Sequence, residues 1–199
     1  MLLLLKFISK FLIYKKMPVE KTLIHIILGP MFSGKSTELV RRAERFDSIG
    51  MKIFLINHYL DSRTENYIKT HSGKKLKATK LQKLMNVFDN KEYIEADVIG
   101  IDEAQFFPDL LEFIKIAETH KKVFIIAGLD GDYKREPMGD LLKIIPYCNT
   151  VEKLTALDMI DKNGNEASFT KRIVPGGDSI LIGAEEKYKA VSRENYLKF

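Results

Sequence analysis

A short glycine-rich segment, Gly29–Ser36, constrains the fold more than any other feature of the chain. It reads GPMFSGKS and satisfies the pattern G-x-x-x-x-G-K-[ST]. An apolar run at residues 22–28 precedes it, and a helical pattern at residues 36–48 follows it. In that setting, loop N–H groups and the helix N-terminus bind phosphate oxygens. The segment therefore predicts a strand, a phosphate-binding loop and a helix, in that order.

Further apolar runs indicate how the rest of the main domain is built. Residues 51–56, 97–101 and 123–127 are rich in aliphatic and β-branched side chains, as buried parallel strands are. Residues 108–119 begin with proline and carry the apolar stripe of an amphipathic helix. Alternating strands and helices predict an α/β fold, a P-loop NTPase-like parallel sheet flanked by helices. Residues 67–79 are predicted to be an irregular excursion or a hairpin.

The pattern changes after about residue 150. Two strand-like segments, 153–160 and 166–173, flank Asn163-Gly164, a dipeptide typical of β-hairpin turns. Residues 175–178 read as a flexible loop. We therefore expect three regions: an N-terminal extension at 1–21, a P-loop α/β domain at 22–150, and a small C-terminal hairpin and loop appendage at 151–199. Such an appendage can close over a ligand at the carboxyl ends of the strands.

The first residues do not have the pattern of a membrane span or a secretory signal. Residues 1–16 read MLLLLKFISKFLIYKK, and lysines interrupt the apolar part. We expect residues 1–21 to be disordered, or to result from an upstream start codon. A membrane-touching or targeting helix is the alternative.

Composition excludes several classes of protein. The single cysteine, Cys148, rules out an intramolecular disulfide and a conventional cysteine-rich zinc site, and it favours a reducing, cytoplasmic setting. The net charge is +5, from 32 basic and 27 acidic side chains. The lysines are scattered along the chain rather than grouped in a stripe, so no nucleic-acid partner and no membrane partner is expected.

A pair of carboxylates, Asp102 and Glu103, follows the apolar run at 98–101. An acidic residue at a strand end is the usual second half of a P-loop nucleotide site, where it serves Mg²⁺. We expect Asp102 to hold the metal directly or through water. Glu103, one residue on, is then a candidate general base.

Five phrases occur in order and together name a family. They are GPMFSGKST at 29–37, DSR at 61–63, DEAQFF at 102–107, GLDGDY at 128–133 and KLTA at 153–156. The chain from about residue 22 to 196 resembles the thymidine kinase family of the cellular, poxviral and bacterial type, type II. The resemblance implies ATP-dependent phosphorylation of the 5′-hydroxyl of thymidine and deoxyuridine in nucleotide salvage and DNA precursor synthesis, with Mg²⁺, in a cytoplasmic homotetramer.

The resemblance also implies roles for individual residues. Glu103 is implied as the general base. The implied nucleotide-binding residues are Gly29, Pro30, Met31, Phe32, Ser33, Gly34, Lys35, Ser36, Thr37, Asp102, Gln105 and Arg63. Ser36, Asp102 and Asp61 are implied for Mg²⁺. The implied nucleoside-binding residues are Met31, Phe106, Leu129, Tyr133, Thr170, Leu181 and Tyr188, of which Tyr133 replaces what is often a phenylalanine.

The chain departs from the family at the zinc site of the appendage. Family members carry two C-x-x-C type pairs there, whereas Asp158, Asp161, Ser192 and Asn195 occupy those positions here. A hydroxyl and an amide do not replace thiolates for Zn²⁺, so we expect no zinc. The retained spacing suggests instead that the two aspartates hydrogen-bond with Ser192 and Asn195.

Two other functions stay open from the sequence. One is a non-catalytic nucleotide- or thymidine-binding relative of the kinases, which would not need Glu103. The other is a P-loop ATPase that acts on nucleic acid, which should show a basic stripe with interleaved aromatic residues and an arginine finger.

Overall fold

The computed structural model describes residues 19–61, 66–69, 73, 75–174 and 187–198. The strands are β1 (Leu23–Gly29), β2 (Ile53–His58), β3 (Tyr67–Lys69), β4 (Lys75–Lys77), β5 (Thr79–Leu81), β6 (Val98–Ile101), β7 (Val123–Leu129), β8 (Thr150–Lys153), β9 (Ala156–Leu157), β10 (Glu166–Ala167), β11 (Phe169–Arg172) and β12 (Tyr188–Val191). The α-helices are α2 (Lys35–Asp47), α3 (Lys91–Glu95), α4 (Leu110–Ala117) and α5 (Arg193–Leu197). Three 3₁₀ turns are η1 (Leu84–Val87), η2 (Ala104–Phe106) and η3 (Leu141–Tyr147).

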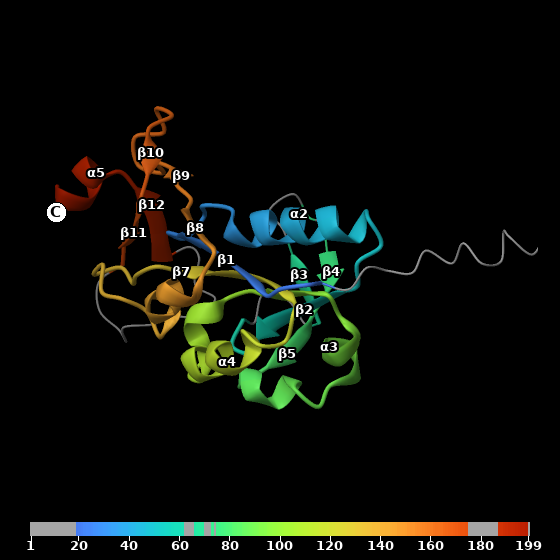
Figure 1. Cartoon of the computed structure of the whole chain (residues 1–199). Coiled ribbons are helices and arrows are strands. Elements are labelled where there is room, and N and C mark those ends of the chain that lie inside the picture. The colour runs from blue at the N-terminus through green and yellow to red at the C-terminus, as the bar shows by residue number, and fades with distance from the viewer. Residues whose placement is uncertain (1–18, 62–65, 70–72, 74, 175–186, 199) are drawn as a thin grey trace, which may run out of the picture.

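Six of the strands form one parallel sheet in the order β5-β2-β6-β7-β1-β8. Helix α2 lies along one face, and α3, α4 and the 3₁₀ turns lie along the other (Figure 1). Two apolar cores result, one on each face. The predicted α/β fold is thereby confirmed, with each predicted strand and helix of the main domain within about two residues of its expected position.

The alternating side chains of β1 show how the sequence builds both cores. Ile24, Ile26 and Leu28 pack into the core that contains α4, while Ile27 packs into the core under α2. Ile26 and Ile27 are both completely buried, as expected of a central strand covered on each face. The strand is thereby fixed from both sides, and the loop that follows it starts from a rigid point.

Some elements differ from the sequence prediction. The 67–79 segment contains the antiparallel pair β3 and β4, which confirms a hairpin, but its end continues into β5 at the edge of the main sheet. The last strand of the sheet, β8, begins where the appendage was expected and runs to Lys153. All four of its residues are exposed, so it lacks the apolar signal of a sheet strand.

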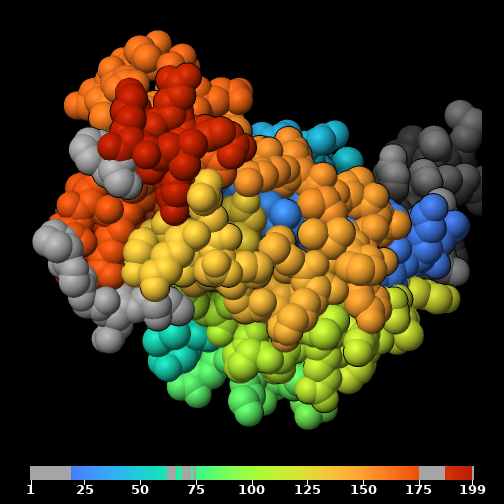
Figure 2. All heavy atoms as spheres, turned by 90° about the vertical axis from the view of Figure 1, so that its left-hand side faces the viewer, coloured from blue at the N-terminus to red at the C-terminus, as the bar shows by residue number. Residues whose placement is uncertain are grey.

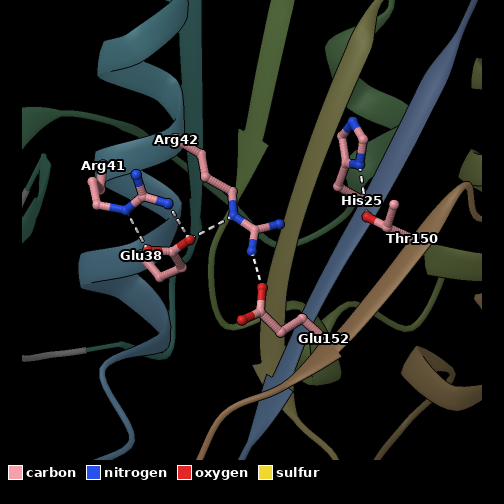
Figure 3. Close-up of polar contacts among 6 residues, drawn as sticks. All are labelled: His25, Glu38, Arg41, Arg42, Thr150 and Glu152. Atoms are coloured by element: carbon pink, nitrogen blue, oxygen red, sulfur yellow. Dashed lines mark hydrogen bonds and ion pairs between the residues drawn. The ribbon is translucent and has the colours of Figure 1, made fainter.

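Strand β8 is attached to the rest of the sheet by polar contacts (Figure 3). His25 Nδ1 of β1 lies 2.8 Å from Thr150 Oγ1, and Arg42 of α2 forms an ion pair with Glu152. Glu38 accepts hydrogen bonds from Arg41 and Arg42 on the same helix. The bond from Arg41 is the main reason why the pKa of Glu38 falls to about 2. These contacts link helix α2 to the sheet edge.

The C-terminal part forms a small lobe of short antiparallel pairs. Strand β9 pairs with β10, β11 pairs with β12, and the chain ends in α5. The lobe stands at the carboxyl ends of the sheet strands, at the corner drawn in orange and red (Figures 1 and 2). The predicted hairpin around Asn163-Gly164 is present, but its strands are shorter than expected.

Two predictions about flexible regions fall outside the described residues. Residues 1–18 of the predicted extension and the predicted loop at 175–178 belong to these parts of the chain. Among the described residues, we find no helix with both the length and the hydrophobicity that crossing a membrane would require.

Candidate active site

The glycine-rich loop joins β1 to α2 at the carboxyl edge of the sheet. Gly34 caps α2 in the left-handed conformation, with a φ of 82°, and Phe32 also has a positive φ of 65°. Lys35 Nζ donates a hydrogen bond to the Pro30 carbonyl at 2.6 Å, so its side chain curls back over the loop. The predicted strand, loop and helix order is confirmed, and this arrangement is the one that binds phosphate.

The sheet register brings the acidic pair to the same edge as the loop. Ile101, the last residue of β6, lies opposite Ile126 of β7, and Gly29 of β1 lies opposite Leu129 of β7. Asp102 follows β6 directly, is 3% exposed, and donates its backbone N–H to the Ile56 carbonyl at 2.9 Å. Asp102, Leu129 and the loop therefore lie at the carboxyl ends of three neighbouring strands, β6, β7 and β1.

Glu103 has an uncommon backbone conformation for its residue type. Its φ is 53° and its ψ is 40°, in the left-handed region, which costs a non-glycine residue about 1–2 kcal/mol. Gln105 Nε2 donates a hydrogen bond to Glu103 Oε2 at 2.6 Å. Strain of this kind is typical of functional positions, where surrounding contacts hold the residue in place.

The end of β2 contributes polar residues that the sequence analysis missed. Asn57 Nδ2 donates to Asp61 Oδ2 at 2.9 Å, and both side chains are buried. His58 is 2% exposed and packs its ring 5.7 Å from Phe106. Burial lowers the pKa of His58, which favours a neutral ring. The signal available in the sequence was position alone, since both residues directly follow the strand predicted at 51–56.

Several of the predicted nucleoside-binding residues contact one another or another predicted site residue. The rings of Tyr133 and Tyr188 lie 6.4 Å apart, centroid to centroid. The backbone N–H of Met31 donates to Thr170 Oγ1 at 2.9 Å. Leu129 N–H donates to Gln105 Oε1 at 3.0 Å, which places Leu129 next to the Glu103 contact. Two predicted site residues, Arg63 and Leu181, lie outside the described residues.

The small lobe contacts the phosphate loop directly. Phe32 packs against the cluster formed by Ala156, Ala167 and Ala190 of the lobe. Beside this junction, a hollow of about 290 Å³ opens between the end of β1, the 130–137 loop and β11. Figure 2 shows this face of the molecule. Thr170 lines the hollow as well as contacting Met31, so the lobe and the loop form one continuous surface.

Asp158 takes the central place among the four residues predicted to occupy zinc-ligand positions. Its Oδ1 accepts the backbone N–H groups of Ile160 and Asp161 at 2.8 and 3.0 Å. Its Oδ2 accepts the Ser192 N–H at 2.6 Å and Asn195 Nδ2 at 2.9 Å. Burial raises the pKa of Asp158, but the hydrogen bonds from Ser192, Asn195 and Asp161 lower it by a larger amount. The net pKa therefore lies well below its usual range.

The expected contact between the two ligand-position pairs is therefore confirmed for Asp158, which bonds to both Ser192 and Asn195. Asp161 is exposed, and its backbone N–H donates a hydrogen bond to the Asp158 carboxylate. Among the residues that the structure describes, no group of three or more His, Cys, Asp or Glu side chains is placed to hold a metal ion. The absence of zinc stays a prediction.

Taken together, the sheet, the loop and the strand-end carboxylates define a P-loop protein with a phosphate-binding site. Comparison with known proteins makes this specific: residues 22–196 match the thymidine kinase family. The chain therefore belongs to the thymidine kinase family, as the motifs predicted, and it is a kinase.

Viral relatives support the same assignment. The thymidine kinase of Yaba monkey tumor virus is 43% identical over 175 residues, covering 88% of this chain and 94% of that protein. The thymidine kinases of raccoon poxvirus and of vaccinia virus strain Western Reserve are each 40% identical over 174 residues, covering 87% of this chain and 96% of the relative.

A comparison with solved structures gives a more distant match. Domain III of the Thermotoga maritima replication initiation protein DnaA aligns with a TM-score of 0.38 and 14% identity, covering 75% of this chain and 61% of that one. A similarity at this level carries no argument about function.

Proposed function

We propose that this protein transfers the γ-phosphate of ATP to the 5′-hydroxyl of thymidine and deoxyuridine. The observation that carries the proposal is the position of Glu103. It directly follows the buried Asp102 at the end of β6, and β6 is separated from the strand of the phosphate loop by β7 alone. A carboxylate at this place can accept a proton from a hydroxyl that attacks a bound phosphate.

In the proposed reaction, the phosphate loop and Lys35 bind the phosphates of ATP. An ammonium group has three donors, so Lys35 can keep its bond to the Pro30 carbonyl while it donates to phosphate oxygens. The 5′-oxygen forms a bond to the γ-phosphorus, the bond from that phosphorus to the β-phosphate bridging oxygen breaks, and ADP leaves. Glu103 takes the proton of the hydroxyl. We propose that Arg63 assists in holding the phosphates.

The residues predicted for Mg²⁺ have the chemistry that this ion needs. Ser36, Asp102 and Asp61 offer hydroxyl and carboxylate oxygens, and Mg²⁺ at phosphate sites takes one or two protein ligands together with phosphate and water. When bound, the ion neutralises charge on the phosphates. Asp102 is buried directly after β6, Asp61 is buried three residues after β2, and Asn57 orients the Asp61 carboxylate through its amide.

We propose that thymine binds against Met31, Phe106, Leu129, Tyr133, Thr170 and Tyr188, with Leu181 contributing from outside the described residues. The contacts that support this are the pairing of Tyr133 with Tyr188 and the bond between Met31 and Thr170. Both contacts join loops at the carboxyl ends of the main-sheet strands to the small lobe. The protein is further proposed to be a zinc-free, cytoplasmic homotetramer without nucleic-acid or membrane partners.

A kinase assay with ATP and Mg²⁺ tests the proposal. We expect phosphorylation of thymidine and deoxyuridine, and little or none of deoxycytidine or deoxyguanosine. Glu103→Gln should lower kcat by about 10²–10⁴-fold while ATP still binds, because it removes the base and leaves the phosphate loop intact. Turnover of none of the four nucleosides would favour a non-catalytic binding protein. Size-exclusion chromatography with light scattering tests the tetramer.

A further inference from the structure

We propose that Gln105 is a positioning residue that holds the carboxylate of Glu103 in its working orientation. The inference rests on the proposed role of Glu103 as the base. Gln105 lies two residues after Glu103 in the η2 turn, and its side chain is 4% exposed. It donates from Nε2 to Glu103 Oε2 at 2.6 Å and accepts at Oε1 from the Leu129 N–H at 3.0 Å.

The orientation of the Gln105 amide follows from its two partners. A backbone N–H can only donate, so the amide atom that faces Leu129 has to be the oxygen. The atom that faces Glu103 is then the NH₂ group, the complement of an ionised carboxylate. Strand β7 thus fixes one end of the amide, and the other end fixes Glu103 Oε2. With Oε2 held, the direction of the whole carboxyl group is set.

Two glycines make space for Gln105, Gly128 for its side-chain amide and Gly139 for its backbone. A Cβ on Gly128 would stand 2.6 Å from Gln105 Oε1, which is closer than real Cβ contacts. A Cβ on Gly139 would stand 2.2 Å from the Gln105 carbonyl oxygen, and the φ of Gly139 is 57°. Side chains at either position would displace Gln105. Gly128 therefore leaves room for the side-chain amide beside β7, and Gly139 leaves room for the backbone that carries it.

The role is needed because Glu103 has a strained backbone. A residue in the left-handed region relaxes unless neighbours hold it, and a bond to its own side chain is one means of doing so. A mispositioned base lowers the rate of proton transfer while leaving substrate binding unchanged. This role differs from the nucleotide contact that the family resemblance implied for Gln105. Loss of the positioning role should lower kcat, whereas loss of a nucleotide contact should raise the KM for ATP.

The decisive variant is Gln105→Glu. It has nearly the same shape and keeps an acceptor for the Leu129 N–H, but it places a second carboxylate against Glu103 in place of the donor. We expect kcat for thymidine to fall about tenfold or more, with the KM values for thymidine and ATP changed less than about threefold. Gln105→Met, which removes both hydrogen bonds, should behave similarly. Leu141→Val is the matched control, because Leu141 packs beside Gly128; it should lower Tm and leave kcat unchanged.

A double variant that combines changes at Glu103 and Gln105 completes the test. In a Glu103→Gln protein, the added change Gln105→Met should lower the residual kcat less than about twofold, because Gln105 acts through Glu103. Wild-type kcat in Gln105→Glu, a raised KM for ATP with unchanged kcat, or fully additive losses would each overturn the proposal. If Glu103→Gln itself keeps wild-type kcat, the base assignment fails. If Glu103→Gln is impaired and Gln105→Glu is not, the positioning role alone fails.

Discussion

The backbone N–H of Met31, in the phosphate loop, donates a hydrogen bond to the side-chain oxygen of Thr170, in strand β11 of the small lobe, at 2.9 Å. These residues are 139 positions apart in the chain. Thr170 is 6% exposed and Met31 is half-buried, so the bond is partly buried. The glycine-rich loop proposed to bind phosphate and the lobe proposed to cover thymidine are thus joined by a direct hydrogen bond.

Replacing Thr170 by valine tests this contact. Valine has the same shape but leaves the Met31 N–H without its acceptor, which should lower the free energy of unfolding by about 1–3 kcal/mol. We also expect a higher KM for thymidine. Urea denaturation and steady-state kinetics measure both effects. Thr170→Ser keeps the hydroxyl and should stay close to wild type in KM; a serine variant as impaired as the valine variant would argue against the hydrogen bond.

Replacing Asp158 by asparagine should destabilise the protein. The carboxylate accepts four hydrogen bonds, and an amide at this place would turn an NH₂ group toward donors such as the Ser192 N–H. We expect a loss of about 2–3 kcal/mol in the free energy of unfolding, measured in urea. The exposed neighbour supplies the control, since Asp161→Asn should change stability by less than about 0.5 kcal/mol. Equal effects at both positions would contradict the central role of Asp158.

Removal of divalent metal should leave the fold unchanged. The buried Asp158 carboxylate already ties the two predicted ligand pairs together by hydrogen bonds, so the lobe is predicted to hold together without zinc. Incubation with EDTA is expected to leave Tm within about 2 °C of the untreated protein. Elemental analysis should find far less than one zinc per chain. A stoichiometric zinc content, or loss of the folded lobe in EDTA, would refute this prediction.

Acidification should destabilise the protein through three histidines. Burial is the main cause that lowers the pKa of His25, His58 and His120 below the ordinary value of 6.5. Between the folded and unfolded pKa values, the unfolded chain binds more protons, so stability falls as pH drops below about 6.5. Unfolding curves at pH 8, 6.5 and 5.5 measure the decline. His120→Gln should show a shallower decline; constant stability from pH 8 to 5.5 would contradict the prediction.

The sequence was sufficient for the elements that bury apolar surface on both sides. Strands β1, β2, β6 and β7 carry continuous aliphatic runs, and the P-loop pattern fixed the order of β1 and α2. The pattern could not reveal β8, because an exposed edge strand such as Thr150–Lys153 needs no apolar side chains and is placed by pairing with β1. Strand β5 has three residues, too few for any periodicity.

The site was predictable as a set of residue types but not as a set of contacts. The motif phrases indicated Glu103 and Gln105, yet only the folded chain brings the Gln105 amide between Glu103 and Leu129, which are 26 positions apart. Asn57 and His58 lie outside the quoted phrases, and their neighbours come from other strands. Asp158 was expected to join Ser192 and Asn195, and its two bonds to the backbone of the 158–161 turn depend on the local geometry of that turn.

The packing of Phe32 against the cluster of Ala156, Ala167 and Ala190 has a consequence for synthesis on the ribosome. Phe32 leaves the exit tunnel long before Ala190 is translated. The α/β core can form while translation continues, but the apolar cover of the phosphate loop is complete only after Ala190 has been translated. A message truncated before codon 190 would therefore yield a chain that contains every residue of the loop but only part of the apolar surface against which Phe32 packs.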